Sequence, residues 1–154
     1  MKARATILTL ALCFVGVGVR YAADTFIGTW KLNEAKSKIG AGSPKNTTVV
    51  YEAAGDSVKV TVDGTDGDGK PLHNEWTGKY DGKHYAVTGD PNTDTRSYKK
   101  VNDHTLTFTN KKGGKVTISG RGVVSADGKT RTVTLTGTDS KGKKFTSTAV
   151  YDKQ

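Results

Sequence analysis

Histidine, acidic and serine side chains are the groups of this 154-residue chain that could bind a metal ion or catalyse a reaction. His73 and Glu75 share the outward face of one predicted strand, and His84 lies on its hairpin partner, opposite Lys79. Positions 73 and 79 are separated by about 20 Å at the rise of a strand. His104 belongs to a different hairpin. Because no set of three or four ligands forms, the sequence predicts no metal site.

The acidic stretch 63–69, Asp-Gly-Thr-Asp-Gly-Asp-Gly, could be interpreted as a calcium-binding loop. It lacks the EF-hand spacing and the bidentate glutamate of such loops, so a loop at the rim of the fold accounts for it better. The serines lie in loops or on outward strand faces, with no histidine and acid arranged to activate them. No phosphate loop or dinucleotide fingerprint occurs. The sequence therefore predicts a non-enzymatic protein without a cofactor.

Residues 1–23 are typical of a secretory signal peptide. Lys2 and Arg4 precede an apolar stretch, and Ala23 ends the segment immediately before the first acidic residue, Asp24. The apolar stretch is too short and too poorly flanked for a membrane-spanning helix. We expect export to the periplasm or the exterior, cleavage after Ala23, and no transmembrane segment in the mature chain, residues 24–154.

The composition of the mature chain narrows its partners and its means of stabilisation. The only cysteine, Cys13, lies in the signal, so the mature chain has no disulfide and no thiolate. Loss of Lys2, Arg4 and Arg20 with the signal lowers the net charge from +9 to +6. Most of the remaining basic residues are lysines, whose solvated ammonium groups argue only weakly for a nucleic-acid partner. The length suffices for one domain with its own core.

Alternating valine, threonine and tyrosine, punctuated by glycine, aspartate and asparagine, predicts β-structure after residue 45. Turns at 55–56, 81–82 and 127–128 and a loop at 140–142 define four hairpins whose apolar residues meet on one face. The expected pairs are Ala53–Val58, Tyr51–Val60 and Val49–Val62; Tyr80–Lys83, Gly78–Tyr85 and Trp76–Val87; Val124–Arg131, Gly122–Val133, Gly120–Leu135 and Ile118–Gly137; and Leu135–Ser147, Val133–Ala149 and Arg131–Tyr151.

Ten strands are expected in all, with a single helical turn near 34–38. They lie near 26–32, 46–54, 57–63, 71–80, 83–88, 94–101, 104–111, 115–125, 129–138 and 143–152. The register of 94–101 against 104–111 stays open, because Tyr98 and Val101 require opposite phases. An all-β antiparallel chain of this kind closes most economically into an up-and-down β-barrel, which has no free edges, and a two-sheet β-sandwich is the alternative.

The predicted connections differ in length between the two ends of the barrel. The short turns gather at one end, whereas the longest connections, 33–45, 64–70 and 89–93, gather at the other. The predicted barrel would therefore be closed at the end with the short turns and open at the end with the long connections. Trp30, Arg131 and Tyr151 fall together on the inward face at its closed end. They could form a cation–π plug, contributing about 1–2 kcal/mol, or a clamp for an anion that uses charge-assisted hydrogen bonds.

Large aromatic residues and small residues alternate on the predicted inward face. Trp76, Tyr80 and Tyr85 share this face in one hairpin, where they form either a core cluster or the wall of a ligand pocket. Many other inward residues are small, so a barrel of this size could retain a cavity. The predicted ligand-binding residues are Tyr51, Trp76, Tyr80, Tyr85, Phe108 and Phe145.

Gly28-Thr29-Trp30 resembles the Gly-x-Trp signature that opens the first strand in the calycin superfamily, the lipocalins and fatty-acid-binding proteins. In lipocalins a late-strand arginine packs across that tryptophan, and Arg131 matches it by geometry. In fatty-acid-binding proteins a late-strand arginine and tyrosine hold the ligand carboxylate, and Arg131 with Tyr151 is similar in type. The segment 94–98 weakly resembles the second lipocalin motif.

The resemblance covers the mature chain as an architecture, and it extends to small exported lipocalin-like proteins of bacteria. The chain departs from it because residues 33–45 are too short for the two-helix lid of fatty-acid-binding proteins, and because no helix follows the barrel. We expect an exported protein that holds a small, largely apolar ligand in a barrel cavity without catalysis. The competing hypothesis is a filled barrel whose lysine-rich exterior contacts envelope polysaccharide or anionic lipid.

Overall fold

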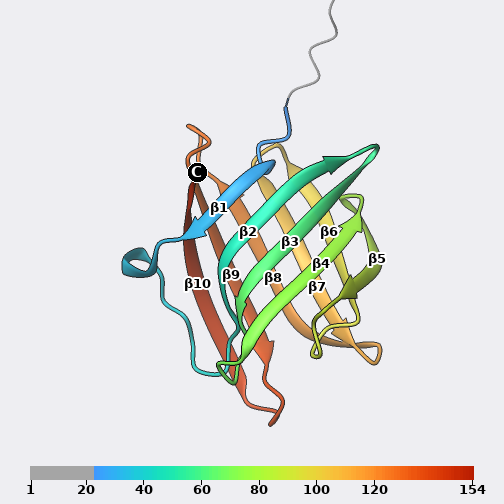
Figure 1. Ribbon diagram of the computed structural model, residues 1–154, viewed down its shortest axis with the longest axis vertical. Coiled ribbons are helices and arrows are strands. Elements are labelled where there is room, and N and C mark those ends of the chain that lie inside the picture. Colours follow the sequence, from blue (N-terminus) through green and yellow to red (C-terminus); the bar gives the residue numbers. More distant parts are fainter. Residues whose placement is uncertain (1–22) are drawn as a thin grey trace, which may run out of the picture.

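The computed structural model describes residues 23–154, which form a closed antiparallel barrel of ten strands (Figure 1). The predicted signal peptide, apart from Ala23, lies outside the described residues. The elements are β1 (Gly28–Leu32), the 3₁₀ helix η1 (Glu34–Lys36), β2 (Lys45–Ala54), β3 (Ser57–Thr65), β4 (Pro71–Gly78), β5 (Asp81–Thr88), β6 (Thr95–Asn102), β7 (Thr105–Lys112), β8 (Lys115–Val124), β9 (Thr130–Thr138) and β10 (Lys144–Lys153).

Each strand pairs with its neighbours in the chain, and β1 pairs with both β2 and β10. This last pairing closes the sheet, so the barrel prediction is confirmed and the sandwich alternative is wrong. The period-two alternation is clear in β9, where Arg131 and Val133 are buried while Thr134 and Thr136 are exposed. Threonine suits the outer face, because its branched side chain favours extended backbone and its hydroxyl stays in water.

Three of the four predicted hairpin registers are confirmed in full. In the β2–β3 hairpin Ala53 faces Val58, and in the β8–β9 hairpin Val124 faces Arg131. In the β9–β10 hairpin Arg131 faces Tyr151. Each register follows from a local turn joined to a hydrophobic phase, both of which can be read along the chain.

The predicted β4–β5 hairpin is only partly correct. The Trp76–Val87 pair forms, together with Glu75–Thr88, but these are the only two rungs between the strands. The predicted pairs Tyr80–Lys83 and Gly78–Tyr85 are absent from the ladder, because Asp81 pairs instead with Lys99 in β6.

The Tyr85 ring explains why this ladder is so short. It packs directly over Gly78, where an added methyl group would lie only 2.6 Å from two ring atoms. The Tyr85 hydroxyl donates a 2.8 Å hydrogen bond to Asp81, and the Lys83 amide donates one of 2.9 Å to the same carboxylate. The ring therefore occupies the space between β4 and the start of β5, and the start of β5 pairs with β6 instead.

The register of β6 with β7, which the sequence left open, pairs Tyr98 with Phe108. The register then shifts between Lys100 and Asn102, so that Val101 becomes the extra residue of a β-bulge. Val101 is 52% exposed as a result. The bulge reconciles the opposite phases of Tyr98 and Val101, because one additional residue reverses the side to which the following side chains point.

The two ends of the barrel differ as predicted. The β2–β3, β4–β5, β6–β7 and β8–β9 connections lie at one end, together with the segment 24–27 and the C-terminus (Figure 1). Phe26 of this segment is buried and its ring lies 6.0 Å from that of Tyr51. The Thr25 hydroxyl donates to the carbonyl of Asp103 in the β6–β7 turn, so the segment crosses this end and closes it.

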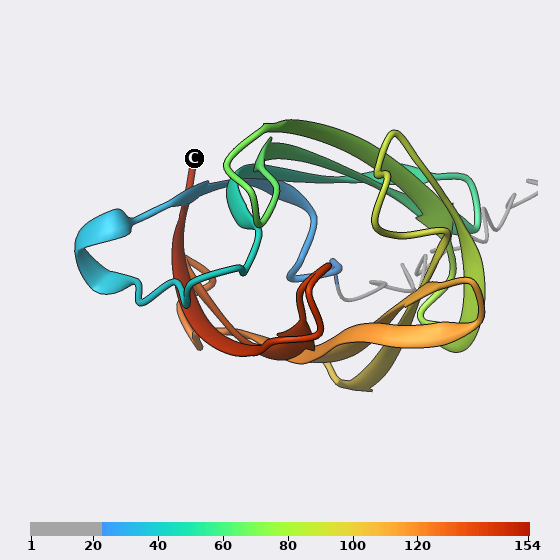
Figure 2. The ribbon, with the colours of Figure 1, turned by 90° about the horizontal axis from the view of Figure 1, so that it is seen from below.

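The longer connections surround the other end, which Figure 2 views directly. They include residues 33–44, 66–70 and 89–94. The Lys38–Thr148 bridge ties the first of these loops to β10. Within residues 23–154 no helix is long and apolar enough to cross a membrane.

Candidate ligand site in the barrel interior

The barrel interior contains two adjoining cavities. The inner chamber, of about 80 Å³, lies between the strands, and Arg96 and Arg131 are among its lining residues. The mouth chamber, of about 210 Å³, lies among the loops at the open end. Both are lined by Pro44, Leu72 and Ile118, so they meet at this level. The apolar lining of the inner chamber comprises Phe26, Ile39, Val49, Tyr51, Val62, Leu72, Tyr98, Leu106, Phe108, Ile118, Val133, Leu135, Ala149 and Tyr151.

Arg131 lies at the closed end of the inner chamber and is surrounded by aromatic rings. Its guanidinium carbon lies 4.5 Å from the ring centroid of Tyr151, 5.1 Å from that of Tyr51 and 5.6 Å from that of Trp30. Its Nη1 donates a 2.7 Å hydrogen bond to the Tyr51 hydroxyl. The structure therefore brings the predicted Trp30, Arg131 and Tyr151 together, and it adds Tyr51 to them.

Burial sets the protonation state of the two tyrosines beside Arg131. Desolvation raises the pKa of Tyr51 far above its usual range, and the positive charge of Arg131 opposes that rise only in part. Burial also raises the pKa of Tyr151. Both hydroxyls therefore stay neutral, so neither supplies a negative charge beside Arg131.

Trp30 is held in place independently of Arg131. The side chain is fully buried, and its Nε1 donates a 2.8 Å hydrogen bond to the carbonyl of Phe26 in the segment that crosses the closed end. The Lys153 ammonium lies 5.2 Å from its ring centroid. Trp30 therefore links β1 to the segment 24–27 that closes this end of the barrel.

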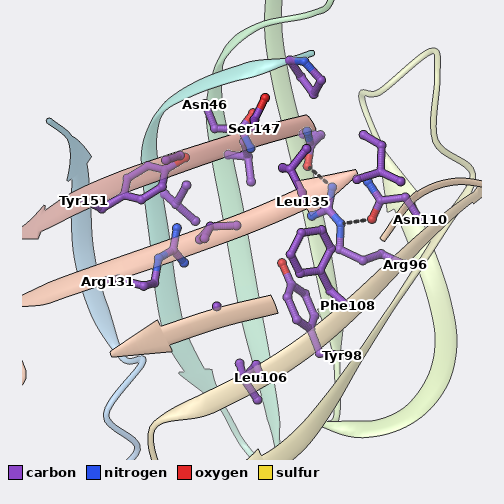
Figure 3. Close-up of a pocket in the computed structure, with 18 of the residues that line it drawn as sticks. Asn46, Arg96, Tyr98, Leu106, Phe108, Asn110, Arg131, Leu135, Ser147 and Tyr151 are labelled. Atoms are coloured by element: carbon purple, nitrogen blue, oxygen red, sulfur yellow. Dashed lines mark hydrogen bonds between the residues drawn. The ribbon is translucent and has the colours of Figure 1, made fainter. Parts of the chain in front are cut away.

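A second arginine, Arg96 on β6, lies inside the barrel, and the sequence reasoning did not single it out. It is only 6% exposed. Its Nε donates a 2.9 Å hydrogen bond to Oδ1 of Asn110, and its Nη2 donates one of 3.4 Å to Oδ1 of Asn74. Its Nη1 is buried without a hydrogen-bond partner. Figure 3 shows Arg96 and Asn110 across the cavity from Arg131, with Phe108 and Tyr98 between them.

The position of Arg96 was available in principle from the sequence. Arg96 and Tyr98 are two residues apart on one strand, so an inward Tyr98 requires an inward Arg96. The undecided register of this hairpin concealed that relation. The backbone there is also anchored, since Trp76 Nε1 donates a 2.8 Å hydrogen bond to the carbonyl of Arg96.

Charge is distributed unevenly between the interior and the exterior. None of the lysines in residues 23–154 is buried, whereas two of the three arginines, Arg96 and Arg131, are buried inside the barrel. Asp90 is the one acidic residue that lines the inner chamber. It forms no ion pair with either arginine, and no other carboxylate in the described chain does so. The chamber lining is therefore mainly apolar and contains two arginines and one aspartate that do not pair with one another.

The six predicted ligand-binding residues do not all reach the cavities. Tyr51 and Phe108 line the inner chamber, and Phe145 lines the mouth chamber. Trp76, Tyr80 and Tyr85 line neither.

The three that do not reach a cavity pack into an aromatic cluster around Tyr98. The Trp76 ring lies 4.8 Å from that of Tyr98 and 5.7 Å from that of Tyr85, in edge-to-face arrangements. The Tyr80 ring lies 6.1 Å from that of Tyr98. Such pairs add to the stability that burial alone supplies. The cluster fills the side of the barrel where the β4–β5 ladder is shortest.

The outward histidines and the acidic loop make local contacts only. His73 Nδ1 lies 2.6 Å from Asp63 across the β3–β4 pair. Asp66 accepts 2.9 Å hydrogen bonds from the amides of Asp68 and Lys70, which shapes the rim loop. Within residues 23–154 no group of three or more histidine, cysteine or acidic side chains is arranged to hold a metal ion.

Comparison with known proteins gives a structural likeness without a sequence relative. No protein-family model matches the chain, and no curated protein matches it. A Schistosoma mansoni fatty acid binding protein, solved in complex with arachidonic acid, superposes with a TM-score of 0.56 at 19% identity, covering 84% of this chain and 96% of that one.

Two redesigned β-barrels are also similar, at lower TM-scores. One has a TM-score of 0.43 at 15% identity, covering 86% of this chain and 95% of that one. The other, solved bound to DFHBI, has a TM-score of 0.41 at 20% identity, covering 83% and 96%. The closed ten-strand topology and the superposition on the fatty acid binding protein together show that the fold is a ten-stranded antiparallel barrel like that of this protein.

Proposed function

We propose that this protein is exported and binds a small, largely apolar molecule non-covalently inside its barrel. The observation that carries the proposal is the inner chamber, which is lined mainly by apolar side chains and adjoins a wider chamber at the open end. Binding would be driven by burial of apolar ligand surface against that lining. The protein acts as a carrier or store, not as a catalyst.

The distribution of large and small side chains inside the barrel supports this proposal. The aromatic cluster around Tyr98 and the plug at Arg131 fill one side and one end, which stabilises the fold. Gly122, Val133 and Ala149 are small residues that line the remaining volume. The fatty acid binding protein that shares the fold was solved with arachidonic acid, so this type of barrel accommodates an elongated apolar ligand. Export rests on the signal-like residues 1–23.

A titration with N-phenyl-1-naphthylamine, a neutral dye that fluoresces in apolar surroundings, tests the proposal. We expect saturable binding by the wild-type protein. Ala149→Leu adds bulk inside the chamber and should weaken binding at least about fivefold without lowering the melting temperature by more than a few degrees. Ala126→Leu, on an exposed turn, is the matched control and should change neither quantity.

Two results would contradict the proposal. One is the absence of saturable dye binding by the folded wild-type protein. The other is equal binding by the Ala149 and Ala126 variants, which would place the dye outside the chamber. If neither result is found, native mass spectrometry of protein purified from its source would identify the bound molecule directly.

A further inference from the structure

Phe26 forms the floor of the inner chamber. Its side chain is buried, and it is one of the lining residues at the closed end. The segment 24–27, to which it belongs, lies across the barrel interior in Figure 2, which looks into the open end. The Phe26 ring lies 6.0 Å from that of Tyr51, and a methyl group added at Gly122 would lie 3.8 Å from it. Phe26 therefore separates the chamber from the closed end.

The main chain around Phe26 is held at three points, so this floor is fixed. The Phe26 amide donates a 3.0 Å hydrogen bond to Oδ1 of Asp24. The Phe26 carbonyl accepts one of 2.8 Å from Nε1 of Trp30. The Thr25 hydroxyl donates to the carbonyl of Asp103 in the β6–β7 turn. A ligand that extends past Phe26 must break these contacts, so the ring limits the length of a bound molecule at this end.

Most of the polar side chains that line the inner chamber gather at its mouth end. They are Asn46, Asn74, Arg96, Asn110 and Ser147. The lining near Phe26 includes the apolar residues Leu106, Gly122 and Val133. Figure 3 shows Asn46 and Ser147 on one side of the cavity and Leu106 on the opposite side. A polar head group finds hydrogen-bond partners at the mouth end, whereas beside Phe26 it would lose those it had in water.

We propose that Phe26 is a specificity-determining residue, which limits the length of an apolar tail that enters the chamber ahead of a polar head group. This inference rests on the proposed function, and it narrows the ligand to an amphipathic molecule with a tail of limited length. In the reverse orientation the head group would lie beside Arg131 at the closed end and the tail would point to the mouth. The tail length would then not depend on Phe26, so the two orientations give different results.

Displacement of bound N-phenyl-1-naphthylamine by the 1-alkanols from hexanol to dodecanol tests the proposal. Every competitor has the same uncharged head group, and each methylene that enters the chamber should strengthen displacement roughly fourfold. For the wild-type protein we expect this increase to stop at one chain length within the series, where the tail meets Phe26. Melting curves establish that each variant is folded.

Substitutions at the floor should move this length limit. Phe26→Ala removes the ring and should move the limit to alcohols at least about two carbons longer. Because truncating a buried phenylalanine is strongly destabilising, two milder variants accompany it. Phe26→Leu should lengthen the limit by about one carbon. Gly122→Ala, whose methyl group would meet the Phe26 ring at 3.8 Å, should shorten it by about one carbon.

Phe145→Ala is the matched control, because it removes the same ring from the mouth chamber. Phe145 is buried like Phe26, but it lies near the start of β10, at the open end. The substitution should change displacement by all the alcohols to a similar extent and leave the length limit in place.

Three results would overturn the inference. One is displacement that strengthens through dodecanol in the wild-type protein, since nothing then limits the tail. Another is a folded Phe26→Leu or Phe26→Ala variant that keeps the wild-type limit. The third is a limit that moves in Phe145→Ala and not in the Phe26 variants, which would place the tail at the mouth. In each case the dye still binds and the proposed function stands, whereas a wild-type protein that does not bind the dye refutes the proposed function itself.

Discussion

Arg131 Nη1 donates a 2.7 Å hydrogen bond to the Tyr51 hydroxyl and thereby joins β9 to β2 across the closed end of the barrel. The two residues are 80 positions apart in the chain. The contact combines a charged donor with a cation–π contact, because the Arg131 guanidinium also lies 5.1 Å from the Tyr51 ring centroid. Its main consequence is structural, since it holds the Arg131 guanidinium among the aromatic rings of the closed end.

Replacing Arg131 by methionine should therefore lower stability more than ligand affinity. We expect a loss of about 2–4 kcal/mol, because the variant loses the aromatic contacts and leaves the Tyr51 hydroxyl unpaired. Urea denaturation followed by tryptophan fluorescence measures this loss. Tyr51→Phe keeps the ring, so it isolates the hydrogen bond. A methionine variant as stable as the wild-type protein would show that desolvation of the guanidinium cancels these contacts.

Because Gly78 has no side chain, it leaves room for the Tyr85 ring in the aromatic cluster. A methyl group at Gly78 would lie 2.6 Å from the Tyr85 ring and 2.7 Å from Trp76. Gly78→Ala should therefore cost about 1–3 kcal/mol and shift the Trp76 emission as the ring moves away. Gly122→Ala is the matched control, because its methyl group would meet Phe26 and Val133 at an ordinary 3.8 Å. Equal effects of the two substitutions would refute this account.

The β-bulge at Val101 makes a prediction about the β6–β7 hairpin. Val101→Lys should change stability by less than about 0.5 kcal/mol, because this side chain is already 52% exposed. Leu106→Ala should cost about 2–5 kcal/mol, since Leu106 is 1% exposed and packs in the core. Thermal unfolding of both variants provides the measurement. A severe loss from Val101→Lys would mean that Val101 faces the core and that the bulge is misplaced.

His73 and Asp63 make the outer β3–β4 pair sensitive to pH. The hydrogen bond to Asp63 is the main cause that raises the pKa of His73 above its usual value near 6.5. Because the folded-state pKa is the higher one, the stabilisation is complete below about pH 6.5 and disappears as the pH rises through the folded-state value. The melting-temperature difference between the wild-type protein and His73→Gln should therefore be larger at pH 5 than at pH 9.

His84 is the natural contrast for this measurement. Desolvation, aided by the nearby charge of Lys111, lowers its pKa. Protonation therefore opposes folding at this position, and His84→Gln should raise the relative stability at pH 5 and have no effect at pH 9. If both histidine substitutions change stability with the same sign at pH 5, the role assigned to Asp63 is wrong.

Local patterns in the chain were enough to predict the frame of this barrel. Asp127 and Gly128 specify a turn, and the apolar phase on either side of it places Val133 and Arg131 on the inward face. Register follows from these two local features, because a slip by one residue would expose every inward side chain. The same reasoning brought Trp30, Arg131 and Tyr151 to one end.

The predictions that failed concern features that depend on contacts between distant segments of the chain. Tyr85 belongs to the aromatic cluster and not to the pocket wall, because Gly78 leaves room for its ring and Asp81 holds its hydroxyl. Arg96 escaped notice because the bulge at Val101 conceals the phase of its strand. Neither effect has a periodic signal, since each arises from how particular side chains fill the space between strands.

The sequence by itself determined the all-β barrel, the inward and outward faces of most strands, and which end is closed. These follow from short-range turn preferences and from the period-two burial of apolar residues. Only the tertiary structure decided where the interior is filled, where it is hollow, and that two buried arginines lie in it without a carboxylate partner. Volume and charge balance inside a closed barrel depend on side chains from every strand at once, so no stretch of the chain contains that information alone.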